Sequence, residues 1–259
     1  MEETASPADS IDRVLVAGAT GRTGREILRT LESTDFEVVG LARSLDDRGE
    51  LLARGADEVV VGDLLEPRDA ARAVRGCDAV LCAVGSGPTL APLFGEPLVD
   101  GEGVRNLVTA AVAADCEAVV FESSIGVGDS ESGMPAGFRM VLGPILRAKN
   151  DSEAALRSSG LRYTILRPGG LTDAPATGNV VVGEGGATVS GTIPRADVAR
   201  LMVAALFTPE ASNRTFEVVS RSGLHGTPRG LVELDWQYPD DRGPVKIEVE
   251  ESEDDEDAE

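Results

Sequence analysis

A glycine-rich turn between an apolar strand and an amphipathic helix constrains the fold of this chain more than any other feature. Residues 14–16 form a short apolar run without helical spacing, typical of a strand that is buried on both faces. Residues 25–31 have the spacing of a helix with one apolar side. Between them, residues 18–24 read GATGRTG. A strand, a glycine-rich turn and a helix in this order form the local structure that a dinucleotide-binding fingerprint requires.

Each glycine of this turn has a distinct predicted role. Gly18 allows a tight turn, Gly21 lets the backbone approach a pyrophosphate, and Gly24 lets the helix pack close to the strand. The free N–H groups at the start of the helix then face the phosphates. The spacing is GxxGxxG rather than GxGxxG, so a plain strand–turn–helix stays open as an alternative for the turn alone. The predicted phosphate-binding turn also contains Thr20, Arg22 and Thr23.

Apolar strands and helical patterns alternate along most of the chain. Further strands are predicted over residues 36–42, 58–61, 79–84, 118–121, 163–166 and 215–219, and helices over residues 46–54, 67–75, 98–114, 145–158 and 196–207. This alternation indicates βαβ units, and hence an α/β fold with a Rossmann-type, doubly wound parallel sheet. In such a sheet a ligand binds at the carboxyl ends of the strands.

Two segments form a predicted small, loop-rich substrate lobe. Residues 126–143 are rich in Gly, Met and Pro, and we expect them to form an irregular active-site loop. Residues 172–191 supply the other half of the lobe, with a short β excursion over the cleft at residues 179–191. The lobe has little pattern, so the substrate cannot be named from it.

Residues 11–239 are predicted to form a single NAD(P)-binding domain. A frayed leader at residues 1–10 precedes it, and an acidic disordered tail at residues 240–259 follows it. The leader is acidic and polar, unlike a signal peptide, and no stretch approaches the ~20 apolar residues of a membrane span. We therefore expect a cytoplasmic protein that does not bind membranes.

The cysteine and histidine content excludes several kinds of site. Cys77, Cys82 and Cys116 lie in or beside apolar runs without metal-ligand spacing, so we expect buried, reduced thiols and no metal site. His225 is the only histidine of the chain, which excludes a histidine-based zinc site and a Ser-His-Asp triad.

The formal net charge of −21 is extreme for 259 residues. So acidic a chain lacks the basic patch that neutralises phosphates, and we expect no nucleic-acid partner. Self-repulsion of this size destabilises a compact state unless salt screens it. Lys149 and Lys246 are the only lysines, and an acidic surface with few lysines favours a high-salt cytoplasm. The expected partner is a small-molecule substrate, and monomer and homodimer both stay open.

Arg43 and Ser44 stand where the second predicted strand ends. NAD-specific sites place Asp or Glu there to bind the ribose 2′-OH, whereas an Arg suits a 2′-phosphate. Arg22 could reach the same phosphate from the glycine turn. The sequence therefore favours NADP (NADPH) over NAD, unless both arginines are ordinary solvated charges.

Two further strand ends carry candidate cofactor contacts. Asp63, followed by Leu64, ends the third strand, where its carboxylate can accept a hydrogen bond from the adenine amino group. A helix cap before Pro67 is the alternative role for Asp63. The small residues at the end of the fourth strand leave room for a cofactor ribose, and these are Ala83, Val84 and Gly85.

Lys149 is the most specific single signal, because it is one of two lysines in a chain that otherwise uses Arg. It falls on the helix after the strand that ends in Ser123 and Ser124. A compact ammonium can hydrogen-bond both ribose hydroxyls and lower the pKa of a neighbour. An ordinary exposed helix lysine is the alternative.

Together these motifs resemble the atypical short-chain dehydrogenases/reductases. The resemblance is to their NAD(P)H-binding group, which is related to NmrA-like regulators, to biliverdin IXβ/flavin reductases and to plant chloroplast members. It covers most of the chain, and its motifs lie at residues 18–24, 61–63, 123–124, 149, 159–171 and 195–199. The resemblance implies that Ser124 lies near the substrate carbonyl and Lys149 on the nicotinamide ribose, with Ser123 beside them. It also implies that the nicotinamide side is lined by Pro168, Gly169 and Leu171.

One departure from the family pattern concerns catalysis. The full catalytic set has a Tyr four residues before the Lys, where it acts as general acid or base, but this chain has Ile145 there. By sequence, Tyr163 lies in a strand and Tyr238 near the acidic tail, so neither replaces it.

Three functions therefore stay open. The first is an NADP(H)-dependent reductase that passes hydride to a quinone, a flavin or a carbonyl compound, with Ser124 and Lys149 as catalytic residues. The second is a non-catalytic NADP(H)-binding redox sensor of NmrA-like type. The third is a sugar-nucleotide epimerase or dehydratase, a chemistry that usually requires the Tyr.

We predict that the melting temperature rises steeply as KCl is raised into the molar range, because screening removes the repulsion among 45 acidic side chains. Thermal unfolding followed by circular dichroism at increasing KCl measures it. A melting temperature indifferent to salt would remove the high-salt hypothesis.

Overall fold

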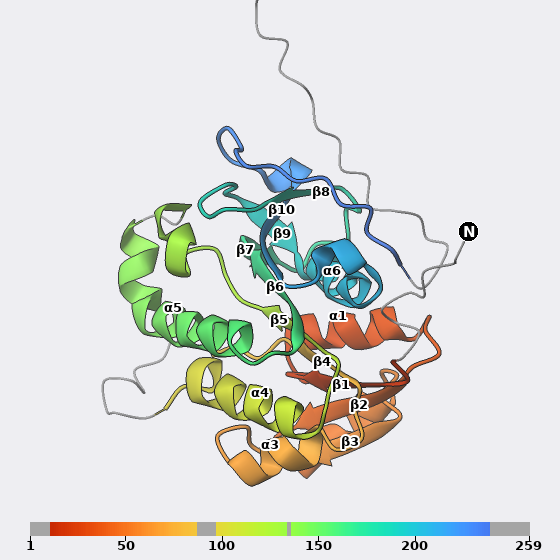
Figure 1. The fold of residues 1–259 in the computed structure, drawn as a ribbon. Coiled ribbons are helices and arrows are strands. Elements are labelled where there is room, and N and C mark those ends of the chain that lie inside the picture. Colours follow the sequence, from red (N-terminus) through yellow and green to blue (C-terminus); the bar gives the residue numbers. More distant parts are fainter. Residues whose placement is uncertain (1–10, 87–96, 134–135, 239–259) are drawn as a thin grey trace, which may run out of the picture.

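The structure, a computed structural model, describes residues 11–86, 97–133 and 136–238. Its main feature is an eight-stranded sheet in the order β3-β2-β1-β4-β5-β6-β10-β8 (Figure 1). All neighbouring strands run parallel except β8, which pairs antiparallel with β10. The strands are β1 (Arg13–Ala17), β2 (Glu37–Ala42), β3 (Glu58–Val61), β4 (Ala79–Cys82), β5 (Ala118–Glu122), β6 (Arg162–Pro168), β8 (Val180–Gly183) and β10 (Arg214–Ser220).

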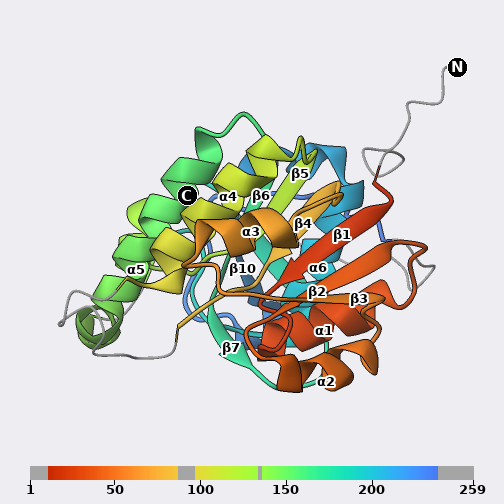
Figure 2. The same cartoon turned by 90° about the horizontal axis from the view of Figure 1, so that it is seen from below.

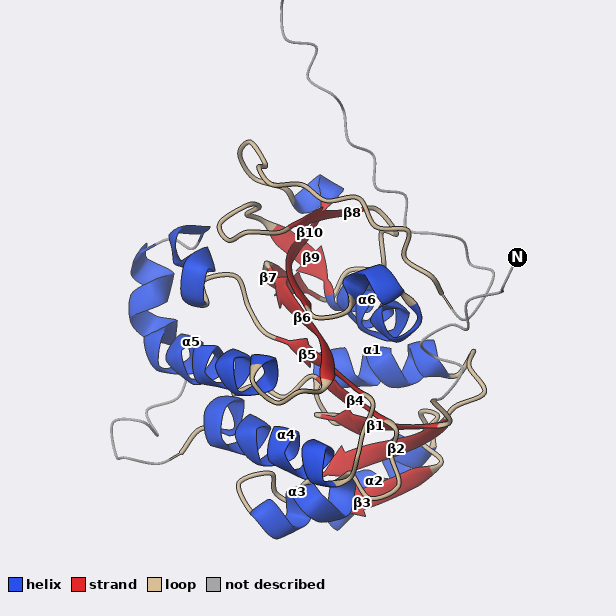
Figure 3. Cartoon of the chain, viewed as in Figure 1, coloured by secondary structure: helices blue, strands red, loops and turns tan. Residues whose placement is uncertain are grey.

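Helices cover both faces of the sheet (Figures 1 and 3). One layer contains α1 (Arg22–Leu31), α2 (Arg48–Leu52) and α6 (Arg195–Phe207). The other layer contains α3 (Pro67–Ala73), α4 (Val104–Ala113) and α5 (Ala136–Arg157). On β1, Val14 and Val16 join the core under α1 and α6, while Leu15 and Ala17 join the core under α3 and α4. The prediction of a doubly wound sheet with a strand buried on both faces is confirmed.

The strand order reverses between β1 and β4. From β1 the chain winds outward to β2 and β3, and it then returns to the other side of β1 as β4 (Figure 2). The helices that follow these strands therefore lie on opposite faces, which leaves a crevice at the carboxyl ends of β1 and β4. The glycine turn follows β1 directly, as the sequence predicts.

Part of the predicted active-site loop at residues 126–143 is helical. A 3₁₀ segment, η4 (Gly128–Gly133), comes first, and α5 begins at Ala136 rather than at residue 145. Gly143 and Pro144 have low helix propensity, but both lie inside this 22-residue helix. A packed face can outweigh the loss of one backbone hydrogen bond at a proline, so local composition was misleading here.

The predicted β excursion over the cleft is wrong in its location. The strand within residues 179–191 is β8, which extends the far edge of the main sheet. A separate two-stranded sheet beside the carboxyl end of β6 consists of β7 (Gly170–Thr172) and β9 (Thr192–Pro194). The apolar pattern of residues 180–183 predicts a strand, but its partner is decided by long-range contacts.

The segment that follows β10 packs back onto the domain. Trp236 is buried, and its ring meets that of Phe216 edge-on at a centroid distance of 5.8 Å. The backbone N–H of Gln237 donates to the hydroxyl of Thr208, at 3.0 Å. The predicted leader at residues 1–10 and tail at residues 240–259 lie outside the described residues.

The three cysteines are free and buried, as predicted. Burial raises the pKa of Cys82 to about 12 and that of Cys116 to about 11, so both are neutral thiols near neutral pH. Over the described ranges, no helix has the length and apolar character that crossing a membrane requires.

A buried ion pair ties β5, α5 and β6 together. Glu153 on α5 is fully buried and accepts two hydrogen bonds from Arg167, at 2.9 Å from Nε and 2.7 Å from Nη2. The same carboxylate accepts a hydrogen bond from the hydroxyl of Ser123. Arg167 is the penultimate residue of β6, and Ser123 follows the last residue of β5. This pair therefore holds together two strand ends that border the crevice.

We predict that Arg167→Met lowers the free energy of unfolding by about 3 kcal/mol, because it removes the buried one of the two guanidinium groups that pair with Glu153 and leaves only the more exposed Arg157. Denaturant unfolding in high salt measures the change. Arg54→Gln breaks a half-exposed pair with Glu50 and serves as the control, with an expected loss of about 0.5 kcal/mol or less. Equal effects of the two substitutions would contradict the assigned role of the buried pair.

Candidate nucleotide-binding site

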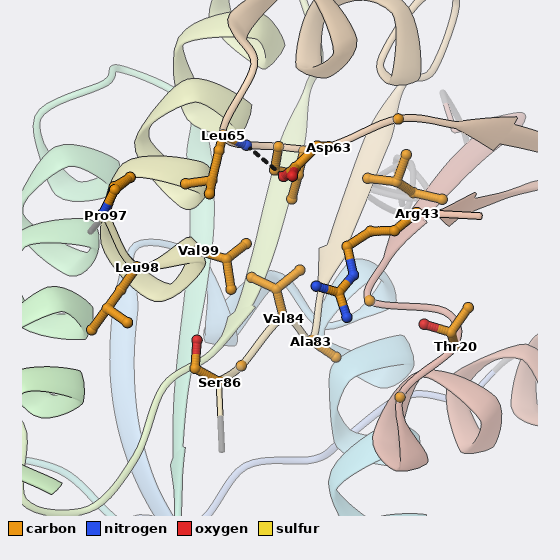
Figure 4. A pocket seen from close by; sticks show the side chains of 16 residues that line it. Thr20, Arg43, Asp63, Leu65, Ala83, Val84, Ser86, Pro97, Leu98 and Val99 are labelled. Atoms are coloured by element: carbon orange, nitrogen blue, oxygen red, sulfur yellow. Dashed lines mark hydrogen bonds between the residues drawn. The ribbon is translucent and has the colours of Figure 1, made fainter. Parts of the chain in front are cut away.

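A pocket of about 620 Å³ opens at the carboxyl ends of β1, β2, β3 and β4 (Figure 4). Its lining includes half of the residues that the sequence predicts, and these are Gly18, Thr20, Gly21, Arg43, Asp63, Leu64, Ala83, Val84 and Gly85. Sequence reasoning missed the others, which are Leu41, Gly62, Leu65, Ser86, Pro97, Leu98 and Val99. Most of the missed residues are apolar, so only their position distinguishes them from core residues.

The glycine turn is packed too closely for side chains at two of its positions. Gly18 has φ +86°, and a Cβ there would lie 2.6 Å from the carbonyl oxygen of Ala83. A Cβ at Gly24 would lie 2.1 Å from the carbonyl oxygen of Gly18. The first helix therefore packs closely on the turn at Gly24, as predicted, and the turn also packs on the end of β4, which the sequence did not predict.

The start of α1 offers unused hydrogen-bond donors to this pocket. Gly21 is the N-cap residue, no side chain caps the helix, and its first turn contains no acidic residue. Within the described residues, no acceptor meets the backbone N–H groups of Arg22, Thr23 and Gly24. A Cβ at Gly21 would approach only the carbonyl oxygen of Gly18, at 3.1 Å, so the space beside the helix end is open. This geometry suits a phosphate group.

Arg43 points into the pocket from the end of β2, toward Ala83 and Val84 (Figure 4). It is exposed, and it forms no ion pair with any of the described residues. Arg22, by contrast, pairs with Asp173 at 2.7 Å and does not line the pocket. Of the two arginines predicted to meet a 2′-phosphate, only Arg43 lines the pocket, and the contact with a 2′-phosphate stays a prediction for both.

The loop after β3 is held from two sides. Asp63 accepts a hydrogen bond at Oδ1 from the N–H of Leu65, at 3.0 Å, which leaves its other carboxylate oxygen free for the pocket. From α4, the amide of Asn106 donates to the carbonyl oxygens of Leu64 at 2.9 Å and Leu65 at 3.3 Å. The alternative of a helix cap is wrong, because Glu66 is the N-cap residue of α3.

Ser44, predicted with Arg43, has a local role. Its hydroxyl accepts a hydrogen bond from the N–H of Asp46, at 3.1 Å, and caps the 3₁₀ turn η1 (Leu45–Asp47). It does not line the pocket, and its cofactor contact stays a prediction.

Lys149 is buried, which excludes the alternative of an ordinary surface lysine. Its ammonium donates to the carbonyl oxygens of Glu122 at 3.0 Å and Val84 at 3.4 Å, and it lies 3.4 Å from Oδ1 of Asp100. Asp100 is fully buried and accepts a hydrogen bond from the N–H of Ser86 at 2.8 Å. Lys149 thus links the ends of β4 and β5, and its contact with a nicotinamide ribose stays a prediction.

Asp100 lies in an unusual element that the sequence did not predict. The residues before α4 form a π-helical turn, η3 (Val99–Gly103), whose first residue lines the pocket. The hydroxyl of Ser152 donates to the carbonyl oxygen of Asp100, at 2.6 Å. Single π-helical turns frequently mark functional sites, and this one contributes Val99 to the lining of the pocket. Asp100 is followed by Gly101 and a second acidic residue, Glu102, so nothing in the local sequence indicates a buried carboxylate.

The residues predicted for the nicotinamide side lie at the same edge of the sheet, beyond the pocket. Ser124 is half-buried, and its hydroxyl donates to the carbonyl oxygen of Ile125 at 2.9 Å. A Cβ at Gly169 would lie 2.4 Å from the carbonyl oxygen of Gly191, so this position requires glycine. The remaining residues pack into the domain, and these are Ser123, Pro168 and Leu171. The structure places all of them near the ends of β5 and β6, but their contacts with a cofactor stay predictions.

Neither tyrosine of the chain replaces the missing one. Ile145 is buried on α5, one turn before Lys149. Tyr163 is near the start of β6, at the amino edge of the sheet and therefore opposite the pocket. Tyr238 lies in the C-terminal segment, where Arg200 of α6 covers its ring at 5.1 Å.

The chain was compared with known proteins and solved structures. The family model described as NAD(P)H-binding matches residues 18–209. A chloroplastic protein of Arabidopsis thaliana is 37% identical over 217 residues, which cover 81% of this chain and 77% of the relative. Sanguinarine reductase of Eschscholzia californica is 30% identical over 247 residues, with coverages of 80% and 89%.

Two solved structures extend the comparison. A Bacillus halodurans protein described as an NAD-dependent epimerase/dehydratase has a TM-score of 0.72 and 33% identity, and covers 84% of this chain and 96% of its own. The anaerobilin reductase ChuY of Escherichia coli O157:H7 has a TM-score of 0.71 and 25% identity, with coverages of 81% and 97%. The family match, the order of the strands and the glycine turn agree, and the chain belongs to the NAD(P)H-binding family, among the atypical short-chain dehydrogenases/reductases.

Proposed function

We propose that this protein is an NADP(H)-dependent oxidoreductase that reduces a small electron acceptor, such as a quinone, a flavin or a carbonyl compound. The proposal rests on the pocket at the ends of β1 to β4, which contains an open helix end and the guanidinium of Arg43, with which no described residue forms an ion pair. NADPH, when bound, supplies a hydride to an acceptor that the protein holds close to it.

The residues of the pocket fit such a dinucleotide. The open space beside Gly21 admits a pyrophosphate to the free amides of α1. Leu41 and Leu65 supply apolar surface for an adenine ring, and Asp63 has an oxygen free for its amino group. Arg43 would meet a 2′-phosphate, where an NAD-specific site would present a carboxylate.

We expect the wild-type protein to bind NADPH about tenfold to hundredfold more tightly than NADH, since a hydrogen bond to a charged group contributes about 1.5–3 kcal/mol. Arg43→Glu should abolish or reverse this preference, because a carboxylate would repel the 2′-phosphate. Fluorescence titration with both nucleotides measures the ratio. Arg68→Glu makes the same charge change at an exposed site outside the pocket, and it should leave the ratio unchanged. Equal wild-type affinities would refute the NADP preference.

The contacts of α5 shape the reacting end of the site. Lys149 fixes the carbonyl groups of Val84 and Glu122, and therefore the spacing between β4 and β5. Ser124 would orient the acceptor at the end of β5. With Ile145 in place of a tyrosine, quinones, flavins and conjugated rings are favoured acceptors, because they can take their proton from water. The two relatives whose names describe reductases support reduction over epimerisation.

A non-catalytic NADP(H)-binding sensor is the second candidate. The buried Ile145 favours the sensor, because isoleucine, unlike the usual tyrosine at this position, has no ionisable proton to donate or accept. A sugar-nucleotide epimerase or dehydratase is less compatible with this site for the same reason, although one structural relative is described in those terms.

Turnover distinguishes these functions. We predict that NADPH is oxidised in high salt by at least one member of a panel of quinones, flavins and ketones, followed at the nicotinamide absorbance band. Ser124→Ala and Lys149→Ala should each lower the rate by about tenfold or more, as expected for groups that orient reactants. Arg147→Ala, two residues from Lys149 and exposed, is the matched control. Tight NADPH binding without turnover would support the sensor, and absent binding would refute both functions.

A further inference from the structure

Glu122 is a buried carboxyl group that the proposed function leaves without a role. It is the last residue of β5 and is 7% exposed. Val120 belongs to the core beneath α1 and α6, whereas Phe121 belongs to the opposite core. Because side chains alternate along a strand, the side chain of Glu122 faces the α1 layer, as Val120 does.

The carboxyl group of Glu122 lies directly below the first turn of α1. The hydroxyl of Thr23 donates to its Oε1, at 3.1 Å. Thr23 is the second residue of α1, between the two other residues whose backbone N–H groups lack acceptors among the described residues. A phosphate bound to these amides would therefore lie close to the Glu122 carboxyl group.

The cations that face Glu122 are already paired with other carboxylates. Lys149 from α5 lies 3.4 Å from Asp100, and Arg195 from α6 lies 2.6 Å from Asp173. Cys82, at the end of β4, is a neutral thiol in the core on the opposite face of the sheet. No described residue forms an ion pair with Glu122 itself. Burial is therefore the dominant influence, and it raises the pKa of Glu122 to about 7.

We propose that Glu122 is a further determinant of cofactor binding, and that the dinucleotide binds with uptake of a proton at this carboxyl group. The inference rests on the proposed site for the pyrophosphate. An ionised Glu122 would place a third negative charge beside two phosphates, and because this carboxyl group is only 7% exposed, water screens the Coulomb repulsion weakly. The protonated carboxyl group has no such repulsion, so cofactor binding selects the protonated form.

Because NADPH binding is coupled to protonation of Glu122, the affinity for NADPH depends on pH in a fixed direction. Below pH 7 the carboxyl group is already protonated, and binding requires no proton uptake. Above pH 7 each binding event must take up a proton, so the affinity falls with rising pH by up to about tenfold per pH unit. The 2′-phosphate of the cofactor has a pKa of about 6, so it titrates below this range.

The test is the dissociation constant of NADPH between pH 7 and 9 at constant ionic strength, with calorimetry at pH 8 in buffers of different ionisation enthalpy. The wild-type constant should rise about tenfold or more over this range, with proton uptake in calorimetry. Glu122→Gln preserves the acceptor for Thr23 and should give a constant independent of pH, without proton uptake. Glu122→Met is a second variant, which lacks the side-chain amide of Gln, and it should also give a dissociation constant that is independent of pH. Glu210→Gln, at an exposed site on the 3₁₀ turn Pro209–Ala211, should keep the wild-type pH dependence.

Stability without cofactor gives an independent readout. In the folded protein the pKa of Glu122 is raised to about 7, above its value in the unfolded chain. The protonated carboxyl group therefore stabilises the fold fully at a pH below the unfolded pKa, and this stabilisation is lost as the pH rises through about 7. Stability of the wild type should therefore fall more than that of Glu122→Gln between pH 6 and 8. Wild-type binding with no pH dependence, or with the pH dependence that Glu122→Gln also shows, would overturn the role of Glu122 alone. Absence of NADPH binding at every pH would overturn the proposed function with it.

Discussion

The close contact between the glycine turn and the end of β4 is the constraint on which the rest of this structure depends. A methyl group at Gly18 would meet the carbonyl oxygen of Ala83 at 2.6 Å, and one at Gly24 would meet Gly18 at 2.1 Å. Any side chain there would push α1 away from the strands, and α1 is packed against α6. The same contact directs the free backbone amides of α1 toward the pocket. The glycine turn therefore determines both the packing of α1 and the position of the hydrogen-bond donors in the site.

A second set of contacts holds the edge of the sheet where the substrate would react. Lys149 and Glu153, one turn apart on α5, each bind the ends of neighbouring strands. Both side chains are buried, so each depends on its ion-pair partners: Lys149 on Asp100, and Glu153 on Arg167 and Arg157. In this chain α5 therefore stabilises the edge of the sheet. The position on α5 where the family pattern has an acid–base tyrosine is occupied by the apolar Ile145.

Much of the fold could be predicted, because strands buried on both faces appear as short apolar runs and regular alternation with helices admits few topologies. Part of the pocket lining could be predicted for the same reason: Arg43, Asp63 and Ala83 each follow the end of a strand. The start of α5 could not, since Pro144 and Gly143 have low helix propensity and only packing outweighs it. Asp100 and Leu65 could not either, because nothing local distinguishes a pocket wall from a core or a surface.

By itself, the sequence determined the strands, the glycine turn and the kinds of side chain at the strand ends, because these follow from local spacing and from the backbone freedom of glycine. The tertiary structure decided how those side chains are paired. It directs Arg43 into the pocket, pairs Arg22 with Asp173, and buries Glu122 beneath α1. Which charge remains free and which is neutralised depends on distances between segments that are 99 residues apart for Thr23 and Glu122 and 151 for Arg22 and Asp173. Such distances exist only in the folded chain.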